Sequence, residues 1–560
     1  MSTELRERTG GKILIDALVL HGVDTVFAVP GESYLEALDA LNDVSNHIRL
    51  VTCRQEGGAC YMAEAYGKLE SRPGVCFVTR GPGACNASIG IHTAMQDSTP
   101  MVVFIGQVER GHKGREAFQE IDYKAMFGSV AKWVAEIDDP RRIPEIVHRA
   151  FATAASGRPG PVVVSLPEDM LTERCTVHDG RPYQAVRPHP GGAEIDRMIA
   201  LLRQAERPLM IVGGSGWTAQ ASADVGSFAE ANAIPVLCSF RRQDSIGTER
   251  PVFVGDLGTT ITPATIKRLE EADLLLVVGA RLGEMTTRGY TLLETPAPKQ
   301  TMIHVHADPD ELGRVFQPDL GIVAGTQEFG AALRDLPPLA ERPWASWTEE
   351  ARKTYLEGRK PKAFDTALDL GAVMTTLDET LPDDTIIAID AGNFSGWPQR
   401  FWRYRAPKSL VGPTNGSMGY GVPGGIAAKI AEPDRTVVTF VGDGGFMMTG
   451  QELSTAVAHN VNVLILVFNN SMYGTIRMYQ ENLHPGRIIG TDLTNPDFAA
   501  LARAYGAHGE TVEQTAEFAP ALDRALKSGK PAVIELKVSQ EIISTFASLT
   551  EIRARVNAAG

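Results

Sequence analysis

Long apolar runs are missing from this sequence, and so are clusters of basic residues. Because a helix needs about 20 consecutive apolar residues to cross a membrane, we expect no membrane partner. The 560 residues carry a formal net charge of −14. Without a Lys/Arg-rich stretch, such a chain is poorly suited to bind nucleic acid or anionic membrane surfaces. An anionic cofactor or substrate would therefore have to be held locally, by a metal ion and by backbone amides.

Cysteine is also scarce. The six cysteines form no CxxC motif and no paired framework, and several stand in apolar surroundings. We therefore expect buried free thiols in a reducing compartment. Residues 1–12 contain no apolar core of the kind that a signal peptide needs. The expected location is the cytoplasm.

Length and composition fit a chain of several globular domains. Apolar residues make up 43% and charged residues 22% of the sequence, which is ordinary for a globular protein. At the usual domain size, the length suggests three to four domains. Apolar strands alternate with helical segments, which predicts α/β domains with parallel sheets. We expect three such domains, at residues 1–172, 190–335 and 365–545, joined by linkers at 174–190 and 341–362.

The most informative stretch lies in the third domain. An apolar run at 436–441 is broken by Gly442-Asp443-Gly444, and a helical segment follows. A second apolar run at 463–468 ends at Asn469-Asn470. Ligands of parallel α/β sheets bind at the carboxyl ends of the strands. We therefore expect Asp443 and Asn470 to lie near each other there.

These side chains suggest a particular ion. Carboxylate and amide oxygens suit Mg²⁺, whose coordination is often completed by phosphate groups. Gly444 and Gly445 lack a Cβ atom, so backbone N–H groups could approach a diphosphate at the start of the helix. A tight turn in an ordinary βαβ unit is the alternative for Gly-Asp-Gly alone. The 24 residues from 445 to 468, placed between this motif and Asn469-Asn470, make the pattern far more specific.

Val441-Gly442-Asp443-Gly444 through Asn469-Asn470 resembles the thiamine diphosphate signature. The chain as a whole resembles the acetolactate synthase-like, pyruvate oxidase-decarboxylase type of thiamine diphosphate-dependent enzymes. The resemblance implies a pyrimidine-binding, a central and a diphosphate-binding domain. It also implies that Asp443 and Asn470 hold Mg²⁺ by their side chains and Met472 by its backbone carbonyl. In this family the cofactor lies between two subunits, so a homodimer or homotetramer is implied.

Glu56 follows an expected strand at 49–53 and precedes an expected helix at 57–69. From the sequence alone, it is a carboxylate favoured by the helix dipole. The resemblance implies more, because the segment CRQEGGACYMAEAYG matches the family's segment whose Glu bonds N1′ of the cofactor's aminopyrimidine. That contact favours the imino tautomer, which removes the C2 proton of the thiazolium.

Three further residues would contact the cofactor according to the resemblance. Asn393 stands where the family hydrogen-bonds the diphosphate end. Met418 would support the bent form of the cofactor, and the carbonyl of Gly416 would accept a hydrogen bond from the 4′-amino group. The bend brings the 4′ nitrogen next to C2, which is a proximity effect.

The substrate side combines two patterns. Phe118 and Gln119 match residues that border the substrate in acetolactate synthases. Glu32 resembles an acidic residue of 2-oxo acid decarboxylases, and a solvated carboxylate at a helix start is the alternative. Acetolactate synthases carry a small residue at that place. They carry Met and Trp where this chain has Thr475 and Tyr479.

The expected central domain has a Gly-rich turn at 213–216, which alone is a weak nucleotide signal. Acetolactate synthases carry Met-His-Gly where this chain reads Asp256-Leu257-Gly258. The Arg-Phe-Asp-Asp-Arg segment of that family is replaced here by residues 281–285. These departures argue against FAD, and ADP or no ligand are the alternatives for this domain.

The resemblance implies a reaction on 2-oxo acids, with decarboxylation to an enamine followed by carboligation. We expect an acetolactate synthase-like carboligase, which is a transferase. The alternatives are a non-oxidative 2-oxo acid decarboxylase, an acyl-CoA C–C lyase, and a catalytically silent partner subunit that binds thiamine diphosphate. The polar residues 480–491 are expected to form a mobile loop over the site.

Overall fold

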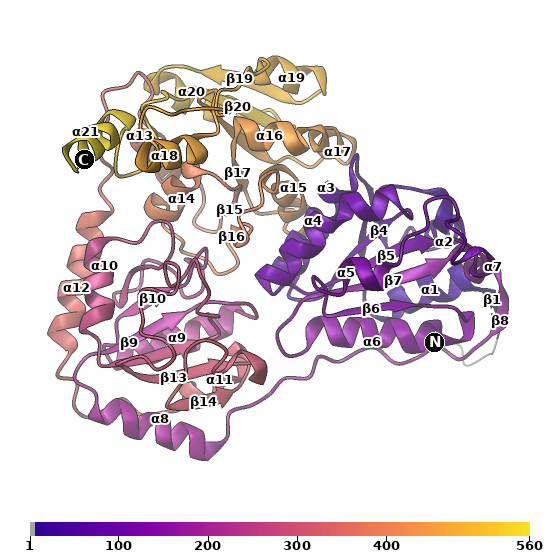
Figure 1. Cartoon of the computed structure of the whole chain (residues 1–560), viewed down its shortest axis with the longest axis horizontal. Helices are drawn as coiled ribbons and strands as arrows, with labels where there is room; N and C mark the ends of the chain where they lie inside the picture. The colour runs from indigo at the N-terminus through magenta and orange to yellow at the C-terminus, as the bar shows by residue number, and fades with distance from the viewer. Residues whose placement is uncertain (1–5, 560) are drawn as a thin grey trace. The chain divides into compact units, whose positions relative to one another are not determined.

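The computed structural model describes residues 6–559, which contain three six-stranded parallel sheets and one short antiparallel pair of strands (Figure 1). The expected α/β class with three parallel sheets is confirmed. The first five residues of the expected first domain lie outside the described residues. The chain forms two compact units. The first contains the residues up to Val186 together with Val422–Pro433 and Thr449–Val461, and the second contains the remainder.

The sheet of the first unit has the strand order β3-β2-β4-β5-β7-β6, and all of its neighbours are parallel. The four inner strands, β2, β4, β5 and β7, are buried along their whole length because helices cover both faces of the sheet. Their bounds are β2 (Thr25–Ala28), β3 (Arg49–Thr52), β4 (Gly74–Val78), β5 (Met101–Gln107), β6 (Trp133–Glu136) and β7 (Pro161–Pro167).

Helices α1 (Gly10–Leu20), α2 (Leu35–Asp43) and α6 (Ile143–Ala155) pack against alternate residues of these strands on one face. Helices α3 (Glu56–Glu70) and α4 (Pro82–Asp97) pack against each other on the opposite face (Figure 1). Two short helices, α5 (Tyr123–Phe127) and α7 (Glu168–Thr172), complete this domain. Because β3 pairs with β2 in this sheet, the position of the start of α3, four residues after β3, is also fixed.

The central sheet has the order β11-β10-β9-β12-β13-β14. Its strands are β9 (Pro208–Val212), β10 (Val236–Cys238), β11 (Phe253–Asp256), β12 (Leu274–Val278), β13 (Thr301–His306) and β14 (Leu320–Val323). Its helices are α8 (Gly192–Gln204), α9 (Ala219–Ala231), α10 (Pro263–Glu271) and α11 (Thr326–Arg334). At the ends of β9 and β12 the backbones are tightly packed, because a Cβ atom at Gly214 would lie 1.9 Å from the carbonyl oxygen of Gly279. Close packing therefore accounts for a glycine in the 213–216 turn.

The third sheet has the order β16-β15-β17-β18-β20-β19. Its strands are β15 (Ile386–Ile389), β16 (Leu410–Val411), β17 (Val437–Gly442), β18 (Leu464–Asn469), β19 (His508–Val512) and β20 (Ala532–Lys537). The helices of the second unit in this part of the chain are α13 (Leu370–Thr380), α14 (Gly396–Phe401), α16 (Asp443–Thr449), α18 (Gly474–Leu483), α19 (Phe498–Ala504), α20 (Thr515–Lys527) and α21 (Leu549–Ala559). Helices α15 (Gly421–Ala431), from Val422 onwards, and α17 (Leu453–Ala458) belong to the first unit.

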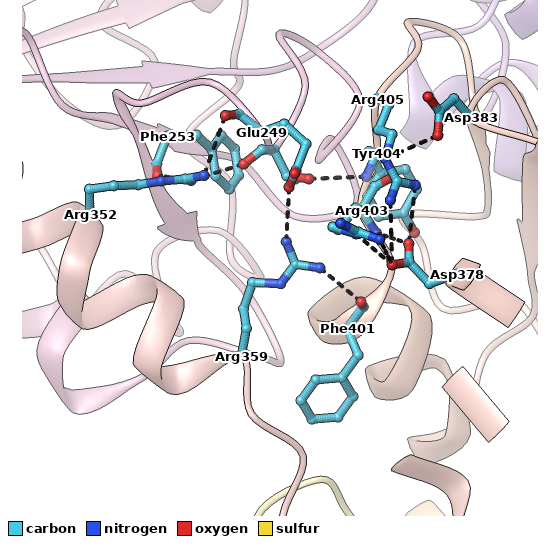
Figure 2. A network of polar contacts seen from close by, with 11 residues as sticks. Glu249, Phe253, Arg352, Arg359, Asp378, Asp383, Phe401, Arg403, Tyr404 and Arg405 are labelled. Carbon is cyan, nitrogen blue, oxygen red and sulfur yellow. Dashed lines mark hydrogen bonds and ion pairs between the residues drawn. The ribbon is translucent and has the colours of Figure 1, made fainter. Parts of the chain in front are cut away.

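The linker expected at 341–362 is wrong in part, because it contains helix α12 (Ala345–Gly358). Figure 2 shows how arginines anchor this segment. Arg352 donates to the carbonyl oxygens of Thr248 and Phe253, at 2.9 and 2.8 Å. Arg359 donates to the carbonyl oxygen of Phe401 at 2.8 Å. The helix is held by contacts to distant segments, which its charged sequence does not reveal.

Two further expectations need correction. The linker expected at 174–190 begins with a strand, since β8 (Arg174–Thr176) pairs with β1 (Glu7–Thr9) in an antiparallel register. The loop expected at 480–491 begins as helix, because α18 extends to Leu483. Local polarity hid both elements, since partners far away in the sequence supply the contacts that stabilise them.

Four of the six cysteines are buried as free thiols: Cys53, Cys60, Cys76 and Cys238. Cys85 is exposed and Cys175 is partly exposed. None of the helices within residues 6–559 is both long enough and apolar enough to span a membrane.

Candidate functional site

The third sheet brings Asp443 and the Asn469-Asn470 pair to one edge. Strands β17 and β18 are parallel neighbours, and Gly442 stands opposite Phe468 in their register. Asp443 directly follows Gly442, and Asn469 directly follows Phe468. The polar residues at the ends of β17 and β18 therefore lie side by side. Asp443 starts α16 and is only 3% exposed.

Asp443 is a buried carboxylate that hydrogen-bonds only to uncharged donors among the described residues. Its Oδ1 atom accepts the backbone N–H of Gly444 at 2.9 Å, and Oδ2 accepts the side-chain amide of Asn495 at 2.7 Å. Burial raises the pKa of Asp443, and these hydrogen bonds oppose that rise. No Lys or Arg forms an ion pair with it within residues 6–559. A buried carboxylate is stable when paired or bound to a metal, so this environment fits a divalent cation.

The turn after β18 presents further oxygen atoms. Oδ1 of Asn470 accepts the backbone N–H of Met472 at 3.2 Å, which closes a short turn. The turn is held by a second segment, because the N–H of Tyr473 donates to the carbonyl of Thr491 at 2.8 Å. The N–H of Leu493 likewise donates to the carbonyl of Ser471 at 2.8 Å. The backbone of the proposed ligand Met472 is therefore rigidly placed.

Across the described residues, no group of three or more His, Cys, Asp or Glu side chains could hold a metal ion. A metal at Asp443 would therefore depend on one carboxylate, one amide and backbone oxygens. Such a donor set suits Mg²⁺ that keeps other oxygen ligands, for example phosphate groups.

Asn495 is a site residue that the sequence patterns missed. Its side-chain amide donates to Asp443 and also to Oδ1 of Asn469, at 2.7 and 2.9 Å. Asn469 in turn donates to the buried carboxylate of Glu535 at 2.6 Å. Asn495 comes from a loop more than 20 residues beyond the Asn469-Asn470 pair, and no spacing rule points to it.

Close packing at the start of α16 explains why residues 444 and 445 are glycines. A Cβ atom at Gly444 would lie 2.6 Å from the Tyr473 ring, and one at Gly445 would lie 3.0 Å from Oδ2 of Asp390. Asp390 is fully buried and accepts the N–H groups of Gly419 and Gly421 at 3.1 and 2.9 Å. Burial raises its pKa to about 6.

The Asp390 carboxyl thereby fixes the backbone on the carboxyl side of Met418, which is partly buried. Gly416 is exposed and has a φ of +71°, a conformation that glycine adopts without strain. The backbone of the segment proposed to support the cofactor is thus held from one side by a buried acid.

Asn393 is held by its own chain. Its Nδ2 donates to the carbonyl of Ile543 at 2.7 Å, and its Oδ1 accepts the hydroxyl of Thr475 at 2.9 Å. Thr475 lies on α18, so Asn393 links the end of β15 to this helix.

In the first unit, Glu56 is the first residue of α3 and is partly exposed. Its Oε2 atom accepts the side-chain amide of Asn86 at 2.8 Å. Gly81 and the first two residues of α4, Pro82 and Gly83, lie between Glu56 and Gln119. A Cβ atom at Gly83 would lie 3.3 Å from Oε1 of Glu56, and one at Gly81 would lie 2.6 Å from Cβ of Gln119.

The expected substrate residues Glu32, Phe118 and Gln119 come from two segments near residues 79–83. Gln119 has a φ of +67°, and its Oε1 atom is buried with no hydrogen-bond partner among the described residues. Phe118 is 75% exposed and Glu32 is exposed. Next to Glu32, a Cβ atom at Gly31 would lie 2.3 Å from Cβ of Thr79. Gly31 and Gln119 thus both pack against residues 79–83, while the Glu32 and Phe118 side chains are exposed.

Three sequence-family models match the chain. Residues 8–126 match the N-terminal TPP binding domain of thiamine pyrophosphate enzymes. Residues 195–333 match the central domain of thiamine pyrophosphate enzymes, and residues 390–536 match their C-terminal TPP binding domain.

Curated relatives align over nearly the whole chain. The acetolactate synthase large subunit of Parasynechococcus marenigrum (strain WH8102) is 33% identical over 552 residues, covering 95% of this chain and 87% of the relative. The acetolactate synthase isozyme 2 large subunit of Escherichia coli (strain K12) is 31% identical over 539 residues, covering 95% and 96%. The acetolactate synthase large subunit of Corynebacterium glutamicum is 32% identical over 552 residues, covering 95% and 87%.

Proposed function

Because the chain belongs to the thiamine pyrophosphate enzyme family, we propose that it is a thiamine diphosphate- and Mg²⁺-dependent enzyme that forms C–C bonds between 2-oxo acids. The observation that carries the metal site is the buried carboxylate of Asp443, which no cation within residues 6–559 neutralises. It lies beside the Asn470 turn at the ends of two parallel strands, where ligands of such sheets bind.

Asp443, Asn470 and the backbone carbonyl of Met472 would hold the metal ion. Gly444, Gly445 and Asn393 would bind the diphosphate, and Gly416 and Met418 would hold the aminopyrimidine side of the cofactor. When bound, thiamine diphosphate supplies the electron sink that accepts the electrons released with CO₂. The role of the protein is to fix the cofactor's shape and exclude water.

Glu56 is the proposed catalytic acid/base. It would share a proton with N1′ of the aminopyrimidine, a role that needs a carboxyl group held in one orientation. The hydrogen bond from Asn86 supplies part of that orientation. Phe118 and Gln119 would border the substrate, and Glu32 would be the acidic residue on the substrate side.

We place carboligation above the alternatives because the three relatives described above are named acetolactate synthases. Thr475 and Tyr479 replace the Met and Trp of that family and would select a different second substrate. A non-oxidative decarboxylase is the second candidate, since Glu32 resembles an acidic residue of 2-oxo acid decarboxylases.

The proposal includes three domains at 1–172, 190–335 and 365–545, and the matched ranges 8–126, 195–333 and 390–536 lie within them. Glu56 and Asp443 belong to different compact units. We propose a homodimer or homotetramer, in which Glu56 of one subunit completes the site of another.

The test is turnover of pyruvate by the apoprotein supplied with thiamine diphosphate and Mg²⁺, with and without FAD. Acetolactate and acetaldehyde are measured separately. Acetolactate formed only when both thiamine diphosphate and Mg²⁺ are present supports the proposal. Acetaldehyde alone would transfer the assignment to the decarboxylase. If neither product forms, the same assay with branched and aromatic 2-oxo acids and with acyl-CoA esters decides between another 2-oxo acid and the acyl-CoA lyase.

A further inference from the structure

A second buried carboxylate, Glu452, has no role in the proposed chemistry. It ends the short 3₁₀ turn Gly450–Glu452 and comes nine residues after Asp443. Its side chain is completely buried. The residues Thr449–Val461 belong to the first compact unit although they come from the last third of the sequence.

The contacts of Glu452 are with the backbone just before α3. Its Oε1 atom accepts the N–H groups of Arg54 and Gln55, at 3.1 and 2.9 Å. Its Oε2 atom accepts the N–H of Arg54 at 3.2 Å and the hydroxyl of Thr455 at 2.6 Å. Glu56 is the next residue after these two donors. Glu452 therefore holds the peptide units that immediately precede the proposed catalytic carboxyl group.

Glu452 also requires a glycine in the first turn of α3. A Cβ atom at Gly58 would lie 2.7 Å from Oε1 of Glu452. The N–H of Gly58 itself is satisfied by the side chain of Gln55, which caps the helix at 2.9 Å. Glu452 is thus enclosed between the start of α3 and its own turn, where a carboxylate is favoured by the helix dipole and by N–H donors.

Two neighbouring contacts hold the same pair of segments. The side chain of Arg54 donates from Nε to the hydroxyl of Ser454 at 2.8 Å. The N–H of Thr52, at the end of β3, donates to Nε2 of His459 at 3.2 Å. The connection between β3 and α3 is therefore attached to residues 452–459 at three points.

We propose that Glu452 is a positioning residue for Glu56, fixing the first turn of α3 so that the Glu56 carboxyl group points at the cofactor. This inference rests on the proposed function. Because Oε1 of Glu452 accepts the adjacent N–H groups of residues 54 and 55, the peptide units of these residues are held in one orientation. Loss of that acceptor would leave two partly buried N–H groups without their protein partner, which loosens the first turn of α3.

The first measurement is amide hydrogen exchange of residues 52–60 in the full-length protein without cofactor. Glu452→Ala is expected to accelerate exchange there, and Glu452→Gln is expected to leave it near the wild-type rate. A glutamine can keep its Oε1 on both N–H groups and donate from Nε2 to Thr455. Asp224→Asn is the matched control, since Asp224 is another buried carboxylate, 6% exposed and paired with Arg334 at 2.7 Å.

The second measurement is the rate of deuterium exchange at C2 of bound thiamine diphosphate, with kcat and KM. Misplacement by about 1 Å can cost about 100-fold in rate. Glu452→Ala is expected to lower C2 exchange and kcat by about 10- to 100-fold, with KM and cofactor affinity within about threefold. Glu452→Gln should restore both rates to within about threefold of wild type.

If Glu452→Ala does not fold, Gly58→Ala displaces the same carboxylate and is expected to give the same pattern. Equal C2 exchange in wild type and Glu452→Ala would overturn the inference, and so would a Glu452→Gln variant as slow as Glu452→Ala. A wild-type protein that binds no thiamine diphosphate would instead overturn the proposed function, independently of the amide exchange.

Discussion

Asn495 donates its side-chain amide to Oδ2 of Asp443 at 2.7 Å, and this bond fixes the carboxylate at the end of β17. The same amide also donates to Asn469, at the end of the neighbouring strand β18. One side chain thus ties together the ends of both strands that present the proposed metal ligands. Residues of this kind orient metal ligands and tune their affinity.

The first prediction concerns this contact. Asn495→Ala should weaken Mg²⁺ binding about 10- to 100-fold, because Asp443 loses the donor that orients it. The measurement is the Mg²⁺ concentration needed for half-maximal thiamine diphosphate binding, read by calorimetry. Asn46→Ala, at an exposed position, serves as the control. An unchanged Mg²⁺ requirement in Asn495→Ala would show that Asp443 is oriented without Asn495.

The second prediction separates chemistry from binding. Glu56→Gln keeps the size of the side chain and can still accept the hydrogen bond from Asn86, but it cannot share a proton with N1′. General acid–base catalysis contributes about 10²- to 10⁴-fold, so kcat should fall by at least about 100-fold. Cofactor affinity, measured by fluorescence quenching, should change by less than about tenfold. Wild-type turnover in this variant would show that Glu56 is not the catalytic acid/base.

The third prediction is a pH dependence of stability. Burial raises the pKa of Asp390 from its ordinary value of 3.8 to about 6. The folded state therefore favours the neutral acid, whose stabilising contribution is complete below about pH 4 and is lost as the pH rises towards 6. The asparagine of the Asp390→Asn variant carries no titrating group. The free energy of unfolding of this variant, relative to wild type, should therefore rise between pH 4 and pH 7 by on the order of 3 kcal/mol.

Thermal melting of the cofactor-free proteins at pH 4.5, 5.5 and 7 measures this difference. Asparagine accepts fewer hydrogen bonds from Gly419 and Gly421, and this effect adds an offset that does not vary with pH. A constant gap in melting temperature across the series would contradict the raised pKa.

The fourth prediction concerns the last helix. Arg553 on α21 makes two hydrogen bonds to the buried carboxylate of Glu481 on α18, at 2.6 and 3.1 Å. Arg477 also donates to Glu481, at 2.9 Å. Arg553→Met should cost about 1–3 kcal/mol and accelerate amide exchange in α21. Lys527→Met, in an exposed ion pair with Asp523, should cost no more than about 1 kcal/mol. Equal effects of the two variants would show that α21 is held by apolar contacts alone.

Much of this fold could be predicted because parallel strands buried on both faces read as apolar runs. Strand β3 ends at Thr52 and α3 begins at Glu56, within one residue of the expected positions. The spacing between Asp443 and Asn470 was informative for the same reason, since a βαβ unit returns both strand ends to one edge.

Other features could not be read from local patterns. Helix α12 has a charged sequence that is typical of a linker, yet Arg352 and Arg359 anchor it to distant carbonyl oxygens. Asn495 and Glu452 are ordinary polar residues in their own segments. Their roles depend on contacts to residues 52 and 398 positions away in the sequence, respectively. No periodicity or spacing rule encodes such pairs.

The central claim is carboligation of 2-oxo acids that depends on thiamine diphosphate and Mg²⁺. The most direct measurement follows ¹³C-labelled pyruvate by NMR with the wild-type enzyme and with Glu56→Gln, each supplied with thiamine diphosphate and Mg²⁺. We expect labelled acetolactate from the wild type and at least about 100-fold less from Glu56→Gln. Labelled acetaldehyde without acetolactate, or equal acetolactate from both proteins, would contradict the account.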